Sequence, residues 1–135
     1  MAILVGPDTR VIVQGMTGRS GTFYTDLAIR YGSTYVGGVR PGKGGSTHIG
    51  LPIFNTVKEA AEATQANASM VMVPASKAGA ALIEAIEAEI PLVVCVTERV
   101  PVHDISKVKA ALQGSSTVLV GPNSQGVLTP GSCKI

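Results

Sequence analysis

Five short apolar runs, rich in valine and without polar alternation, recur along this chain with helical patterns between them. Such runs are typical of the central strands of a parallel sheet, which are buried on both faces. The expected strands are Arg10–Gln14, Tyr35–Val39, Met70–Val73, Leu92–Val96 and Thr117–Val120. The expected helices are Thr22–Tyr31, Val57–Ala63, Lys77–Ala88 and Ser106–Gln113. The alternation predicts an α/β fold, with a doubly wound, mainly parallel five-stranded sheet in three layers.

The composition limits the class of protein. The chain has 135 residues, of which 45% are hydrophobic and only 4% aromatic, so we expect one domain with an aliphatic core. Eleven basic residues against nine acidic ones give a net charge of +2, which is too balanced to indicate a nucleic-acid partner. No apolar run reaches the length of a membrane span, and no membrane partner is expected.

The expected location follows from the cysteines and the amino terminus. Cys95 and Cys133 lie far apart and indicate neither a disulfide framework nor a metal site. Met1–Pro7 lacks the positive region and cleavage site of a signal peptide. We therefore expect a reducing compartment, the cytoplasm, with the mitochondrial matrix as the alternative in a eukaryote.

The segment Val11–Gly21, VIVQGMTGRSG, ends the first expected strand in a glycine turn. Gly15, Gly18 and Gly21 recur at every third position, and a helical segment follows at once. A strand that ends in glycines and opens a helix places free N–H groups and the positive helix end where an anion can bind. The spacing is GxxGxxG and not the GxGxxG of dinucleotide-binding turns. The segment predicts a phosphate site, with a plain glycine-rich turn as the alternative.

A second glycine-rich segment, Arg40–Gly50, carries Arg40, Lys43 and His48. It is not a P-loop, because Gly44 follows Lys43 where magnesium binding needs serine or threonine. We interpret it as a basic clasp that faces the first glycine turn, and a mobile, solvated loop is the alternative. His48 is expected to be a hydrogen-bonding residue rather than a catalytic base.

The end of the second expected strand discriminates between cofactors. A nicotinamide dinucleotide enzyme needs an acidic residue there to hold the ribose hydroxyls, whereas this chain has Val39 and Arg40, with Lys43 beyond. Arg19, in the first glycine turn, adds a further cation. Positive charge at this place favours a phosphorylated ribose, which both NADP and coenzyme A carry. These residues leave the two cofactors open.

The last segment, Val127–Ile135, reads as folded sequence without a terminal helix or a polar tail. Natural domain termini are usually polar and frayed. We therefore expect that the natural polypeptide continues beyond Ile135, and that an apolar patch is exposed near Cys133–Ile135.

Longer motifs point to a family: VIVQGMTGRSGTFYTDLAIRYG, YVGGVRPGKGGSTHIGLPIFNTVKEA, VPA, VTE and GPNSQGVLTPGSCKI. Together they resemble the alpha subunit of succinate–CoA ligase over essentially the whole chain. The most specific among them are GGVRPGKGG, HIGLPIFNTV and the closing GPN…TPG…CKI. The resemblance implies that residues 1–135 form a Rossmann-like domain of a longer alpha subunit, with coenzyme A as its cofactor.

The resemblance also implies the roles of particular residues. The implied phosphate contacts are Thr17, Gly18, Arg19 and Ser20, with Lys43 as a further contact to coenzyme A. The implied contacts along the coenzyme A arm are Val96, Thr97 and Glu98. The chain departs from the family at Asn123–Gly126, where NCPG is common, and at the pair Arg19-Ser20, where Ser-Gln is common. These departures leave the acid substrate open between succinate, malate and other acids.

The resemblance implies partners as well. The family enzyme, an acid–thiol ligase, relays phosphate through a histidine in the second domain of the alpha subunit and binds its nucleotide on the beta subunit. Neither site can lie in this chain, and His48 does not match that histidine. We therefore expect no catalytic residue here, and as partners the beta subunit and the carboxy-terminal half of the alpha subunit. A free-standing coenzyme A-binding regulatory module and an NADP-binding oxidoreductase domain are the alternatives.

Overall fold

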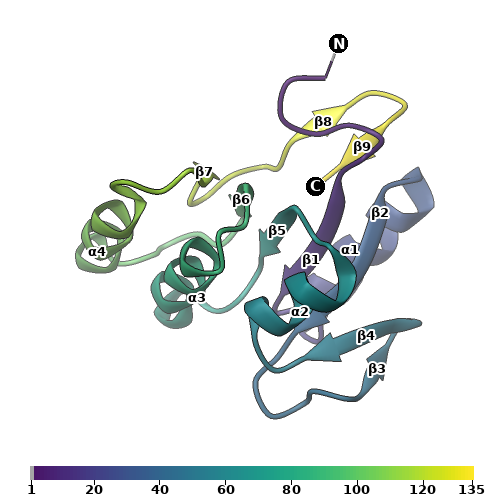
Figure 1. The fold of residues 1–135 in the computed structure, drawn as a ribbon, viewed down its shortest axis with the longest axis horizontal. Coiled ribbons are helices and arrows are strands. Elements are labelled where there is room, and N and C mark those ends of the chain that lie inside the picture. Colours follow the sequence, from purple (N-terminus) through teal and green to yellow (C-terminus); the bar gives the residue numbers. More distant parts are fainter. Residues whose placement is uncertain (1) are drawn as a thin grey trace.

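The strand β1 (Arg10–Gln14) lies in the middle of the main sheet, and the other strands are added on both sides of it (Figure 1). The computed structural model describes residues 2–135. The main sheet has the order β3-β4-β2-β1-β5-β6-β7, and β8 and β9 form a separate hairpin. The further strands are β2 (Thr34–Val39), β3 (Thr47–His48), β4 (Leu51–Phe54), β5 (Ala68–Val71), β6 (Leu92–Cys95), β7 (Val118–Val120), β8 (Leu128–Thr129) and β9 (Cys133–Lys134). The helices are α1 (Arg19–Tyr31), α2 (Val57–Thr64), α3 (Ala75–Glu87) and α4 (Val102–Leu112).

All five expected strands are present and pair in parallel, but the expected number of strands in the sheet is too low. The strand β4 pairs in parallel with β2, and β3 pairs antiparallel with β4. Both arise inside the region expected to be a loop before α2. The strand signal fails there because β4 is short, contains Pro52, and is reached from β2 without an intervening helix.

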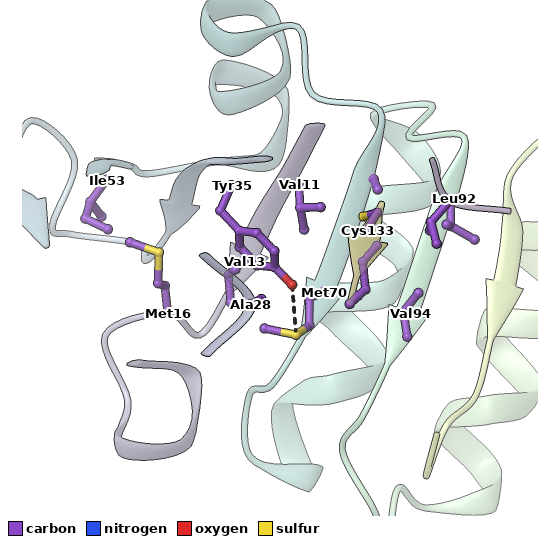
Figure 2. Close-up of a cluster of buried hydrophobic side chains, with 13 residues drawn as sticks. Val11, Val13, Met16, Ala28, Tyr35, Ile53, Met70, Leu92, Val94 and Cys133 are labelled. Carbon is purple, nitrogen blue, oxygen red and sulfur yellow. Dashed lines mark hydrogen bonds between the residues drawn. The ribbon is translucent and has the colours of Figure 1, made fainter. Parts of the chain in front are cut away.

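Helices cover both faces of the sheet, which confirms the three layers. On one face, α1 and the hairpin β8–β9 pack on a cluster that includes Val13, Ala28 and Cys133 (Figure 2). On the other face, α2, α3 and α4 pack around Ile12 and Leu82. Because α1 is the single helix on its face among residues 2–135, the carboxyl halves of β5 and β6 have no helix above them there.

The helix ends follow local signals in part. The capping box before α2 is confirmed, since the Thr56 hydroxyl accepts the N–H of Glu59 at 3.1 Å. The end of α1 at Gly32, with φ +106°, is confirmed as well. The helices α1 and α4 begin earlier than expected, because Gly18 and Pro101 serve as their N-caps. Among residues 2–135, no helix combines the length and apolar character that crossing a bilayer requires.

The expectation of an exposed apolar patch at Cys133–Ile135 is wrong. Cys133 is 1% exposed and Ile135 6% exposed, because β9 packs into the cluster beneath α1. The N–H of Ile135 donates to the Val127 carbonyl at 2.9 Å, and the N–H of Val127 donates back at 3.0 Å. The apolar character of this segment thus reflects burial inside the domain.

Two buried acids in this cluster predict a loss of stability at alkaline pH. Burial, and secondarily the neighbouring Cys133 thiolate charge, raises the pKa of Tyr35, whose hydroxyl faces the Met70 sulfur (Figure 2). Burial likewise raises the pKa of the Cys133 thiol. Both groups stay protonated in the fold at a pH where the unfolded chain ionises them. Their contribution to the free energy of unfolding is therefore complete at neutral pH and is lost as the pH rises above about 9.

Urea unfolding at neutral pH and near pH 10.5 measures this effect. The free energy of unfolding should fall between the two conditions, and it should fall less in a Tyr35→Phe variant. An equal fall in both proteins would contradict the contribution of Tyr35.

Candidate functional site

The glycine turn closes the carboxyl end of β1. Gly15 has a φ of +92°, and its N–H donates to the Val39 carbonyl of β2 at 3.3 Å. A Cβ on Gly15 would lie 2.8 Å from the Met72 carbonyl oxygen, so only glycine fits. The N–H of Gly18 then donates to the Gly15 carbonyl at 3.1 Å, which turns the chain into α1.

The start of α1 has the features of an anion-binding site. Its N-cap is Gly18, and the N–H of Thr22 donates to the Gly18 carbonyl at 2.9 Å. Helix geometry leaves the N–H groups before Thr22 without a helix carbonyl. Gly18 provides no side-chain cap, the first turn carries no carboxylate, and it begins with the exposed cation Arg19. An anion here would meet free N–H groups, the positive end of the helix dipole and a guanidinium.

The loop after β2 lies against the glycine turn, as expected from the sequence. Arg40 directly follows β2, and its Nη1 donates to the Thr17 hydroxyl at 2.6 Å. The N–H of Arg40 donates to the Phe54 carbonyl of β4 at 2.9 Å, which fixes the base of the loop. The contact places a permanently charged guanidinium beside the glycine turn.

Lys43 stands at the junction of two tight turns in the same loop. Its N–H donates to the Arg40 carbonyl at 3.1 Å across Gly42, which has a φ of +82°. Its carbonyl accepts the N–H of Ser46 at 3.2 Å across Gly45, which has a φ of +85°. A left-handed glycine at the third position is the mark of a type II turn. The backbone of Lys43 is therefore held on both sides while its side chain is exposed.

His48 holds the loop against α1. Its Nε2 lies 2.7 Å from the Thr22 hydroxyl oxygen, and that hydroxyl donates to the Met16 carbonyl at 3.0 Å. Because the Thr22 proton is used on the Met16 carbonyl, the imidazole donates from Nε2. This confirms the hydrogen-bonding role expected for His48.

A cavity of about 740 Å³ lies beside α1 at the carboxyl ends of β5 and β6. Its lining combines α1, both strand ends, the loop after β7, and β9. The expected site residues in this lining are Ser20, Val96, Thr97 and Glu98. The lining also includes Asn123, Ser124 and Gln125, which belong to the segment where the chain departs from the family. Further lining residues, which sequence reasoning missed, include Tyr24, Met70, Met72, Lys134 and Ile135. The methionines, Val96 and Ile135 make much of this lining apolar, with polar groups contributed by the loops.

The wall of the cavity formed by β6 and the loop after β7 is internally hydrogen-bonded. The Thr97 hydroxyl donates to the Val73 carbonyl at 2.7 Å, and the N–H of Asn123 donates to the Thr97 carbonyl at 2.9 Å. Arg99 and Asn123 both adopt left-handed backbone conformations, with φ of +59° and +55°. Such conformations in non-glycine residues cluster at ligand sites, where the surrounding structure enforces them.

The predicted site residues fall into two adjacent groups. Ser20, Val96, Thr97 and Glu98 line the cavity. Thr17, Gly18, Arg19 and Lys43 lie on the glycine turn and the neighbouring loop at the same edge of the sheet. Ser20, in the first turn of α1, belongs to both places.

The missed lining residues carry no sequence signal for a ligand. Met70 lies in a buried strand and Met72 directly follows it, so both read as core. Lys134 and Ile135 come from the far end of the chain and reach the cavity because β9 packs beside α1. No residue spacing could have grouped them.

Comparison with known proteins shows which family has this sequence. A family model described as the CoA binding domain matches residues 7–99. The chain is 50% identical over its whole length to the alpha subunit of ADP-forming succinate–CoA ligase from Aquifex aeolicus, covering 45% of that protein. It is 48% identical over its whole length to the corresponding subunit from Staphylococcus epidermidis, again covering 45% of it. The chain thus spans less than half the length of these relatives, and the resemblance seen in its motifs is confirmed.

The fold also matches solved structures. ATP citrate lyase from Methanothrix soehngenii, in complex with citrate and coenzyme A, superposes with a TM-score of 0.81 at 20% identity, covering 97% of this chain and 23% of that one. This likeness confirms the Rossmann-like fold. The family match runs from before β1 to beyond β6 and contains the glycine turn, the Lys43 loop and one wall of the cavity, and the chain belongs to the CoA-binding domain family.

Proposed function

We propose that this chain is the coenzyme A-binding domain of an ADP- or GDP-forming succinate–CoA ligase alpha subunit, and that it holds coenzyme A while acyl-CoA is formed from succinate. The observation that carries the proposal is the meeting of two unlike surfaces at Ser20. One is the glycine turn with its cations, and the other is the largely apolar cavity. Coenzyme A likewise has a charged part next to a weakly polar part: its phosphates lie at the nucleotide end, and its arm leads from there to the thiol.

In this proposal each surface binds one end of the ligand. The phosphate contacts are Thr17, Gly18, Arg19, Ser20 and Lys43. The contacts along the arm are Val96, Thr97 and Glu98. Free N–H groups at the start of α1 and nearby cations suit phosphate. Arg40, held beside Thr17 at 2.6 Å, supplies further charge near the phosphorylated ribose.

The contribution of this chain to the reaction is positioning. Holding the phosphates and the arm in fixed places directs the thiol toward a reacting centre built by other domains, which lowers the entropic part of the barrier. The partners in this proposal are the carboxy-terminal half of the alpha subunit and the beta subunit. The identity of 50% with an alpha subunit of which the chain covers 45% supports this division of labour.

Isothermal titration tests the choice of ligand. Coenzyme A should bind more tightly than NADP or NAD, because the cavity beside the phosphate turn fits an extended, weakly polar arm. Dephospho-coenzyme A should bind more weakly than coenzyme A, because Arg40 and Lys43 lose a phosphate partner. Equal or tighter binding of NADP would overturn the proposal in favour of an oxidoreductase domain.

A labelling experiment tests the absence of catalytic residues. Mixed with a beta subunit and γ-labelled ATP, the 135-residue chain should take up no acid-labile phosphate and form no succinyl-CoA. The reason is that the family resemblance places the phosphate-accepting histidine in the second domain of the alpha subunit, whereas His48 has a structural role, in which its Nε2 contacts the Thr22 hydroxyl. Stable phosphate on His48 would contradict this, and a full-length alpha subunit of a relative serves as the positive control.

A further inference from the structure

We infer that Asn55 is a positioning residue for coenzyme A, because it holds the loop that presents Lys43; the inference rests on the proposed function. Asn55 directly follows β4. Its Oδ1 accepts the N–H of Gly42 at 2.9 Å and the N–H of Gly44 at 3.0 Å. One amide oxygen thus binds the two backbone N–H groups on either side of Lys43.

The loop needs such a restraint. Gly42 and Gly45 have left-handed φ values, and the loop from Arg40 to Thr47 is exposed. Glycine-rich chain in solvent samples many conformations, and each must be given up when a ligand binds. The two turns fix the backbone of Lys43 relative to the loop itself. Backbone hydrogen bonds of Arg40, Gly45 and Ser46 to β4 hold the two ends of the loop on the sheet. Asn55 adds the restraint next to Lys43 itself, at Gly42 and Gly44, so that the ammonium group starts near its bound position.

Asn55 is itself held in place by rigid elements. The strand β4 pairs in parallel with β2, from which the loop departs. The N–H of Asn55 donates to the Glu59 carboxylate at 3.2 Å, within the first turn of α2. A Cβ on Gly44 would collide with the Asn55 side-chain amide, so the loop packs directly against it. A ligand contact on a loop is held more accurately when its support comes from a strand and a helix.

The amide also suits the charge of the site. An asparagine oxygen accepts two hydrogen bonds as a carboxylate would, but it adds no negative charge beside groups that bind phosphate. Asn55 therefore adds no carboxylate of its own that would weaken the attraction of Lys43 for an anion. We therefore expect Asn55 to affect the affinity for coenzyme A through Lys43 and not through a contact of its own with the ligand.

A double-mutant cycle tests the inference by titration with coenzyme A. Asn55→Ala should weaken binding about fivefold to tenfold in the otherwise unchanged chain. In a Lys43→Ala background the same substitution should change the affinity less than about twofold, because the group that Asn55 positions is gone. In the free protein, amide hydrogen exchange at Gly42 and Gly44 should become faster in Asn55→Ala.

Asn67→Ala is the matched control. Asn67 also makes two side-chain hydrogen bonds to the backbone, but at the opposite edge of the sheet, where its Oδ1 accepts the N–H of Arg10 at 2.8 Å and its Nδ2 donates to the Asp8 carbonyl at 3.1 Å. This variant should lose stability and keep its affinity for coenzyme A. It separates a general loss of stability from an effect on the loop.

The outcomes are distinct. Failure of the unchanged chain to bind coenzyme A overturns the proposed function and, with it, this inference. Normal binding by the unchanged chain together with unaltered affinity in Asn55→Ala overturns the inference alone. An equal loss of affinity in both backgrounds also overturns it, because Asn55 would then act independently of Lys43.

Discussion

Replacing Lys43 with alanine is expected to weaken coenzyme A binding about tenfold or more. A charge-assisted contact between an ammonium group and a phosphate contributes roughly 1.5–3 kcal/mol when both groups are well ordered. The turns around Lys43 order its backbone in advance, since its N–H and carbonyl are both hydrogen-bonded within the loop. The melting temperature of the free protein should change little, because the lysine side chain is exposed.

The control for this substitution is Lys107→Ala, which removes an exposed lysine from α4, on the face of the sheet opposite α1. It changes the net charge by the same amount and should leave the affinity unchanged. Higher salt should reduce the difference in coenzyme A affinity between Lys43→Ala and the unchanged chain, because salt screens exposed charges. Normal binding by Lys43→Ala would show that the loop after β2 is not part of the site.

Replacing Gly21 with alanine is expected to cost about 2–3 kcal/mol of stability. Gly21 is buried in the first turn of α1, and a Cβ there would collide with the Gly15 carbonyl oxygen while lying 3.0 Å from the Met16 Cα. These neighbours are backbone atoms that cannot rotate away. Alanine is otherwise better than glycine inside a helix by up to about 1 kcal/mol, so steric overlap must exceed that gain. Moving α1 away from the turn should also weaken coenzyme A binding.

Gly18→Ala in the same motif is the matched control for stability. Gly18 has an ordinary φ of −73°, and its Cβ would lie 3.3 Å from the Gly15 carbonyl oxygen. Its free energy of unfolding should change by less than about 1 kcal/mol. Urea unfolding of both variants measures the difference. An unchanged or increased stability of Gly21→Ala would mean that α1 is not packed on the turn as described.

The parts of the site that the sequence predicted are those built from continuous segments. The glycine turn lies within a few residues, and turn chemistry is readable locally. The contacts at the end of β6 also lie in one short segment, and the family resemblance implied them. The position of the loop after β2 required one further step, namely that parallel strands end at the same edge of a sheet. The contact between Arg40 and Thr17 confirms that this loop lies against the glycine turn. The strand β4 was missed because its few residues include a proline and follow no helix.

The sequence by itself determined the alternation of elements, the parallel sheet and the place of the glycine turn, because hydrophobic periodicity and glycine act over short stretches of chain. Only the tertiary structure decided that Val127–Ile135 folds back beside α1, which buries Cys133 and brings Ile135 to the cavity. It also decided that Asn55 reaches the two N–H groups beside Lys43. These contacts join residues far apart in the sequence, or separated by irregular turns, and they depend on the packing of whole elements, which no local pattern encodes.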